Sequence, residues 1–147
     1  MTTTAVLGHA LPRPQSDDPG ERLLLFGFRQ MAAHGLNDAA AAHAFMTGFG
    51  KEFRRPLLLL RALVAEISAS ASGPIQIAPW CCPRVTYAEA TLLDVLAAAE
   101  RHPERARLLL GDLVGVRRPD GLLATARAVA AAFSDLGLPL GAEERWI

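Results

Sequence analysis

Two adjacent cysteines, Cys81 and Cys82, are the residues of this chain whose side-chain chemistry is least ordinary. They follow Trp80 and lie between Pro79 and Pro83, whose rings restrict the backbone, so the sequence predicts a stiff, non-helical loop here. Thiols in such a loop can carry out redox chemistry, act as a nucleophile or bind a metal. In the alternative interpretation they pack as small apolar side chains beside the tryptophan.

Each chemical role of the two thiols has a specific weakness in this sequence. A metal site would combine Cys81 and Cys82 with His34 and His43, but zinc sites usually leave about two to four residues between paired cysteines. A thioredoxin-type motif would need a Cys-x-x-Cys pair, and no second cysteine completes one here. A nucleophilic cysteine would need a base, for which His34, His43 or His102 are candidates. We therefore expect no metal and no cofactor, and keep Cys81 and Cys82 as candidate catalytic residues of an alternative, thiol-dependent function.

A basic turn formed by Lys51, Arg54 and Arg55 precedes the most apolar helix that the sequence predicts. The free N–H groups and the dipole at the start of a helix favour a negative charge, so this turn is a candidate site for a small anion. It does not match a phosphate-binding loop, because Phe45 occupies the position of the first glycine and Glu52 that of the serine or threonine. The alternative interpretation is a solvated turn whose charges need no ligand.

The length of chain between the basic turn and the cysteines allows the two to meet. The segment Gly73–Pro79 is predicted to be extended, and it can retrace roughly 23–25 Å, about the length of the helix before it. We therefore predict one shared region that combines basic, aromatic and thiol groups, namely Lys51, Arg54, Arg55 and Trp80 beside Cys81 and Cys82. In the opposite interpretation the segment runs elsewhere and the two features stay apart.

Composition and charge limit the classes of protein to which the chain can belong. Its 147 residues, 51% of them hydrophobic and 20% charged, predict one folded domain with a sizeable core. Fifteen acidic and fifteen basic residues give a net charge of zero, which argues against binding to nucleic acid or to a membrane surface. The first residues lack the basic and apolar pattern of a signal peptide. We therefore expect a cytoplasmic protein with reduced thiols.

Helical faces and capping residues recur along the chain and predict an all-α fold. Six helices are expected, from about Asp18 to His34, Asp38 to Thr47, Pro56 to Ile67, Thr86 to Ala99, Glu104 to Val114 and Asp120 to Leu136. We predict a single-domain bundle of five or six helices around the apolar helix that starts at Pro56, with a short extended segment near 75–78. A flexible arm at 1–17 would precede the helical domain at 18–147.

Three local signals in these helices carry structural predictions of their own. Thr86 and Glu89 have the spacing of a capping box, in which each side chain binds a backbone N–H at the helix start. Pro56 suits the first helical position, where its missing N–H is not needed. Gly27 lies inside a helix, where it costs about 1 kcal/mol relative to alanine, so we expect close packing around it.

Two stretches of the sequence, taken together, resemble a small bacterial family of unknown function, of proteobacterial type. They are AHGLNDAAAAHAFMTGFGKEFRRPLLLLRALVAEI and, further on, IAPWCCPRVTYAEATLL, so that the resemblance covers roughly Leu23 to Ala99. It implies no activity and assigns no catalytic residue. It suggests that the turn at Arg55-Pro56 and the loop around the cysteines belong to one unit.

The hydrophobic content of the predicted helices also indicates how the protein works. So many apolar helices in a short chain leave more hydrophobic surface than one small core hides, so we predict a homodimer that forms through helix faces. Because no catalytic constellation stands out, the leading hypothesis is a non-catalytic interaction or regulatory module whose working surface is a helical groove. The alternative is a thiol-dependent redox protein or enzyme that uses Cys81 and Cys82.

Overall fold

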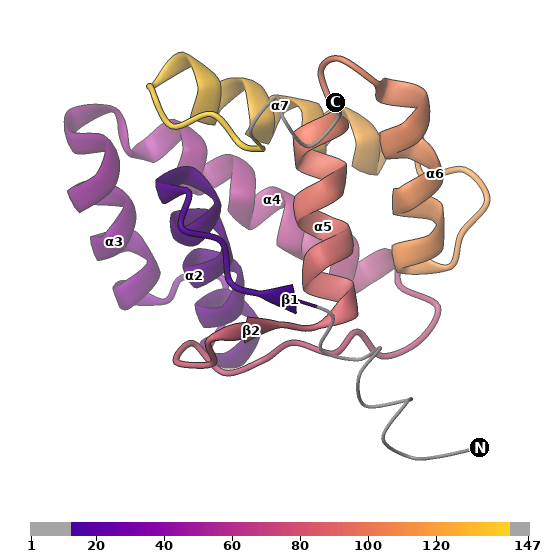
Figure 1. The fold of residues 1–147 in the computed structure, drawn as a ribbon, viewed down its shortest axis with the longest axis horizontal. Helices are drawn as coiled ribbons and strands as arrows, with labels where there is room; N and C mark the ends of the chain where they lie inside the picture. Colours follow the sequence, from indigo (N-terminus) through magenta and orange to yellow (C-terminus); the bar gives the residue numbers. More distant parts are fainter. Residues whose placement is uncertain (1–12, 142–147) are drawn as a thin grey trace.

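All six predicted helices form, and they surround one hydrophobic core (Figure 1). The computed structural model describes residues 13–141. Its helices are α2 (Pro19–His34), α3 (Ala39–Phe49), α4 (Arg54–Ser70), α5 (Tyr87–Ala98), α6 (Pro103–Val114) and α7 (Asp120–Asp135). A short 3-10 helix, η1 (Gly50–Glu52), leads into α4, and two short strands, β1 (Arg13–Pro14) and β2 (Arg84–Val85), pair antiparallel. The described part of the chain is therefore the single all-α domain that the sequence predicts.

The central position expected for the apolar helix is confirmed for α4. It packs against α2, α3 and α7, and its Leu60 and Leu63 are fully buried. On the other side of the domain α5 packs against α6 and α7 and also contacts α2, which extends the same core. One face of α4 nevertheless remains open, since the side chain of Leu58 is 56% exposed. A helix with apolar residues on every face is only partly buried when too few other helices pack around it.

The start of α4 differs slightly from its predicted position. The helix begins at Arg54, so Pro56 is its third residue rather than its first. The amide of Leu57 already donates to the carbonyl oxygen of Phe53 at 3.1 Å, one residue after the proline. Because the first four N–H groups of a helix have no partner within the helix, the proline loses no hydrogen bond in this position.

The segment near 75–78 is irregular and does not pair as a strand. The strand pairing lies further along, where Val85 is opposite Arg13 and Arg84 is opposite Pro14. In this segment the amide of Ala78 and the carbonyl oxygen of Gln76 bind side chains instead of a neighbouring strand, and Ile75 and Ile77 pack against the core. Alternating isoleucines therefore mark a half-buried connection here, and the expected extended segment contributes no sheet.

The end of the predicted N-terminal arm is attached to the domain. Besides the pairing of β1 with β2, the amide of Gln15 donates to the carbonyl oxygen of Pro83 at 2.7 Å. Residues 1–12 of the predicted arm lie outside the described residues. Within 13–141, no helix is long and apolar enough to cross a membrane.

Gly27 shows the close packing that its place inside a helix predicts. A Cβ atom on this glycine would lie 2.8 Å from a ring carbon of Phe45 and 3.1 Å from a methyl carbon of Leu60. The ring of Phe45 in turn contacts the ring of Phe133 edge-on, with 5.8 Å between the ring centroids. The missing side chain of Gly27 thus lets α3 and α4 approach α2.

Candidate functional site around the cysteine loop

The connection from α4 to α5, residues 71–86, holds both cysteines, and we call it the cysteine loop. It runs along the lower edge of the molecule in Figure 1. As predicted, it is non-helical around the cysteines, with a turn closed by a 3.0 Å hydrogen bond from the amide of Cys82 to the carbonyl oxygen of Pro79. A loop of this length with so little secondary structure needs other groups to satisfy its backbone.

A buried ion pair between Arg29 of α2 and Glu89 of α5 supplies those groups. The guanidinium contacts the carboxylate at two points, with 2.8 Å between Nε and Oε2 and 2.9 Å between Nη2 and Oε1. The side chains are 1% and 0% exposed, respectively. Two parallel hydrogen bonds between a guanidinium and a carboxylate are among the strongest ion-pair geometries in proteins. A strong attraction is needed here, because removing two charges from water is costly.

Both members of the pair also form hydrogen bonds to the backbone of the cysteine loop. Arg29 donates from Nη1 to the carbonyl oxygen of Cys82 at 3.0 Å and from Nη2 to that of Arg84 at 2.8 Å. Glu89 accepts from the amide of Ala78 at 3.0 Å and from that of Thr86 at 2.8 Å. Each charged group therefore binds both the opposite charge and two backbone groups of the loop. The loop is thereby bound to α2 and α5 at four backbone positions.

The predicted capping box at the start of α5 is confirmed and belongs to the same network. The hydroxyl of Thr86 accepts from the amide of Glu89 at 3.1 Å and donates to the carbonyl oxygen of Gln76 at 2.8 Å. Glu89 thus completes the helix cap and neutralises Arg29 with the same carboxylate. At the other end of the loop, the amide of Ser72 donates to the carbonyl oxygen of Val114, the last residue of α6, at 2.8 Å.

The two thiols and the tryptophan beside them lie toward the outside of the loop. Cys81 is exposed, Cys82 is partly buried, and the side chain of Trp80 is 60% exposed. The interpretation in which both cysteines are packed as small apolar side chains therefore does not describe Cys81. Neither cysteine is in a disulfide.

The basic turn lies elsewhere. Arg55 forms an exposed ion pair with Asp135 at the end of α7, at 3.0 Å, and the guanidinium of Arg54 lies 6.0 Å from the ring centroid of Phe53. Figure 1 shows the start of α4 near the end of α7, at the upper side of the molecule, whereas the cysteine loop follows the lower side. Within residues 13–141 no hydrogen bond or ion pair joins Lys51, Arg54 or Arg55 to the loop. The shared region and its anion remain a prediction without a contact in its favour.

The histidines proposed as partners of the thiols lie on or beside three different helices. His34 and His43 are exposed on α2 and α3, and His102 precedes α6. Across the described ranges, no three histidine, cysteine, aspartate or glutamate side chains lie close enough to hold one metal ion. The combination of His34, His43, Cys81 and Cys82 therefore does not form a ligand cluster.

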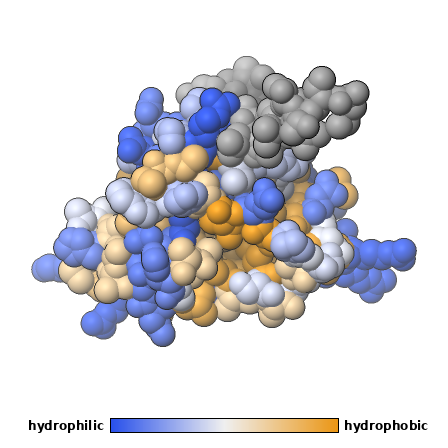
Figure 2. All heavy atoms as spheres, turned by 90° about the horizontal axis from the view of Figure 1, so that it is seen from below, coloured by the Kyte–Doolittle hydropathy of each residue, from blue (hydrophilic) through white to orange (hydrophobic). Residues whose placement is uncertain are grey.

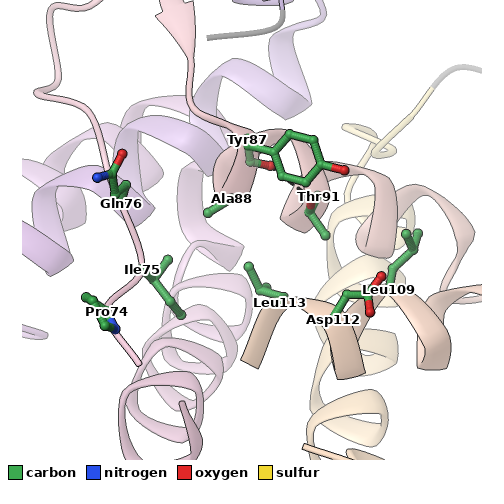
Figure 3. A pocket seen from close by; sticks show the side chains of 9 residues that line it. All are labelled: Pro74, Ile75, Gln76, Tyr87, Ala88, Thr91, Leu109, Asp112 and Leu113. Atoms are coloured by element: carbon green, nitrogen blue, oxygen red, sulfur yellow. Dashed lines mark hydrogen bonds between the residues drawn. The ribbon is translucent and has the colours of Figure 1, made fainter. Parts of the chain in front are cut away.

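Two hollows flank the first part of the cysteine loop, one on each side of Ile75. The first, which we call the α2–α4 groove, has a volume of about 300 Å³ and is lined by Phe28, Ala32, Val64, Ile67, Ser68, Ala71, Gly73, Ile75 and Ile77. The second, the α5–α6 pocket, has a volume of about 310 Å³ and is lined by Pro74, Ile75, Gln76, Tyr87, Ala88, Thr91, Leu109, Asp112 and Leu113 (Figure 3). Figure 2 shows hydrophobic atoms gathered in the middle of the lower face of the molecule, between hydrophilic side chains.

The sequence did not single out Arg29 or the ionic role of Glu89. The capping-box pattern predicts only the cap role of Glu89, and no motif marks Arg29. One signal was available, since Arg29 follows the buried Leu25 by four residues and therefore shares its face of the helix. A charged side chain on a buried face requires a buried partner, although its identity depends on the fold.

The fold and this site define a small single-domain helical protein in which a buried ion pair holds one long loop against the bundle. The chain belongs to the family of unknown function DUF6628, which matches residues 4–138. The match confirms the resemblance to a family of unknown function and extends it well beyond Leu23–Ala99. No curated protein and no solved structure matches the chain.

Proposed function

We propose that this protein is a non-catalytic interaction or regulatory module that acts as a cytoplasmic homodimer, with the α2–α4 groove as its contact surface. The observation that carries the proposal is the groove itself, a hollow of about 300 Å³ whose lining is mostly aliphatic and aromatic. Contiguous apolar surface on a small protein marks sites of interaction. A groove between two helices is also a common way of receiving the apolar face of another helix.

The charge of the chain favours a second copy as the occupant. Two copies with a net charge of zero do not repel each other as a whole, so apolar contact is not opposed by electrostatics. A symmetric pair would bury the same surface twice, which is the commonest arrangement of soluble oligomers. Partly buried Ile75 and Ile77 would then become part of the interface instead of facing water.

A charge placed in the groove tests this proposal. Ala32 is exposed on α2 and lines the groove, while the neighbouring Ala33 is exposed on the same helix and does not line it. The variant Ala32→Glu is expected to shift the protein from dimer to monomer in sedimentation equilibrium at roughly tens of micromolar, because association depends on concentration. The control Ala33→Glu has the same charge near the same helix end and is expected to remain dimeric. A parent protein that sediments as a monomer would overturn the proposal.

The exposure of Cys81 favours one alternative function, a thiol-dependent redox protein or enzyme. Reactive cysteines are accessible, whereas structural cysteines are buried and inert. Labelling of the native protein with a thiol reagent near neutral pH, compared between Cys81→Ser and Cys82→Ser, tests this alternative. A labelling rate at Cys81 far above that of a free model thiol would support it, and a rate equal to the model thiol would argue against it.

A further inference from the structure

The α5–α6 pocket combines apolar walls with a carboxylate, that of Asp112, and an aromatic ring, that of Tyr87. Its volume of about 310 Å³ lies at the small end of the range for small-molecule sites, about 300–1,000 Å³. Three separate parts of the chain form it, namely the cysteine loop, the first turns of α5 and the last turns of α6. In Figure 3, Ile75 on the loop side faces Leu113 of α6 across the pocket, and Tyr87 lies at its α5 end.

The walls of this pocket are fixed by hydrogen bonds within the protein, which exist before any ligand binds. The Thr86 hydroxyl binds the carbonyl oxygen of Gln76, which fixes the loop wall to the start of α5. The Ser72 amide binds the carbonyl oxygen of Val114, which fixes the loop to the end of α6. A site whose walls are ordered before binding loses less conformational entropy when the ligand enters.

The charge at the rim of the pocket is negative and has no partner. Asp112 is exposed on α6, and within residues 13–141 its carboxylate makes no hydrogen bond or ion pair. Arg107, the basic residue nearest to it on α6, pairs with Asp120 instead, at 2.9 Å. The carboxylate therefore remains available to a cation in the pocket.

An aromatic ring stands on the neighbouring wall. The side chain of Tyr87 is 65% exposed, so its ring is accessible to a ligand. The face of such a ring attracts a cation within about 6 Å of its centroid. Apolar side chains of Ile75, Leu109 and Leu113 line the rest of the pocket and would cover the uncharged part of a ligand.

We propose that the α5–α6 pocket binds a small organic cation with an apolar body. The cationic group lies between the Asp112 carboxylate and the Tyr87 ring, and the apolar body packs on Ile75, Leu109 and Leu113. An anion would be repelled by Asp112, and a neutral molecule would gain no electrostatic attraction from the carboxylate or the ring. The pocket lies within one copy of the chain, so this site does not depend on the dimer proposed above.

The test uses three probes that differ in charge but share a phenylethyl group. The full-length protein, labelled with ¹⁵N, is titrated with 2-phenylethylamine, 2-phenylethanol and 3-phenylpropanoate, and binding is followed through the amide chemical shifts. We expect the amine to bind more tightly than the other two, with the largest shifts at Gln76, Thr91 and Leu113, which line the pocket. Equal binding of the three probes, no binding, or shifts confined to the α2–α4 groove would overturn the proposal.

Three variants identify the groups that recognise the cation. Asp112→Asn is expected to weaken the amine about two- to fivefold, since exposed charge pairs are weak, and to leave the alcohol unchanged. Tyr87→Leu keeps an apolar wall without a ring and is expected to weaken the amine as well. Glu104→Gln is the matched control, because it removes the same charge from an exposed position at the other end of α6. An amine affinity that Asp112→Asn leaves unchanged would exclude the proposed recognition.

Discussion

Arg29 and Glu89 lie 60 residues apart in the sequence and form a bidentate ion pair that is almost completely buried. The guanidinium donates four hydrogen bonds and the carboxylate accepts four, and two of these bonds join the guanidinium to the carboxylate. A buried ion pair is a weak source of net stability, because desolvation offsets much of the attraction. The effect of the pair here is to fix the path of the cysteine loop. The backbone groups of the loop, in turn, provide the hydrogen bonds that the buried charges would otherwise make with water.

Removing one charge of this pair is expected to be strongly destabilising. The variant Glu89→Gln leaves the guanidinium of Arg29 buried without a counter-charge, and we expect a loss of about 3–5 kcal/mol in the free energy of unfolding. Urea unfolding followed by circular dichroism measures it. The control is Asp135→Asn, which breaks the exposed pair with Arg55 and is expected to cost no more than about 1 kcal/mol. Equal effects of the two variants would contradict the role given to the buried pair.

Replacing the arginine while keeping its charge is expected to loosen the loop. In Arg29→Lys an ammonium group cannot reach two carbonyl oxygens and both carboxylate oxygens in the arrangement of the guanidinium, so the bonds to Cys82 and Arg84 weaken. The partly buried Cys82 should then react faster with a thiol reagent, measured in a Cys81→Ser background. Cys81 is already exposed, and its rate in a Cys82→Ser background should change little.

The hydroxyl of Thr86 joins the helix cap to the loop, and its loss can be measured at both. Thr86→Ala removes the acceptor for the Glu89 amide and the donor to the Gln76 carbonyl, and we expect a loss of about 1–3 kcal/mol. Thr86→Ser retains the hydroxyl and should retain most of the stability. Faster hydrogen exchange of the amides at 76–78 in the alanine variant alone would show that the loop is affected too.

The helices could be predicted from the sequence because their signals are local. Asp18 accepts from the amide of Glu21, Thr86 and Glu89 form the capping box, and Gly115 ends α6 in the left-handed conformation. Each of these depends on neighbours a few residues away, which the sequence displays directly. Glycine is the residue that adopts a φ of 73° without strain, so the end of α6 is readable as well.

The path of the cysteine loop could not be predicted, because long-range contacts decide it. A chain of seven extended residues reaches equally far in many directions, and only the positions of Arg29 and Glu89 select one. Those two residues approach each other through the packing of α2 against α5, which no local pattern encodes. The candidate pocket depends on the same path, since Ile75 and Gln76 form its loop wall.

The close approach of α2, α3 and α4 at Gly27 allows a last prediction. Alanine is favoured over glycine inside a helix by about 1 kcal/mol, yet a Cβ here would lie 2.8 Å from the buried ring of Phe45 and 3.1 Å from Leu60. Gly27→Ala must therefore displace core side chains, and we expect a net loss of about 1–3 kcal/mol in the free energy of unfolding.

Gly121 provides the matched control for Gly27. It lies in the first turn of α7, and a Cβ there would meet only a carboxylate oxygen of Glu66, at 3.9 Å. Gly121→Ala is therefore expected to be neutral or to stabilise the protein by about 0.4–1 kcal/mol, because it restricts the unfolded chain without a clash. Urea unfolding of the two variants under the same conditions separates steric crowding from helix propensity. A gain of stability in both would show that the core around Phe45 accommodates an added methyl group.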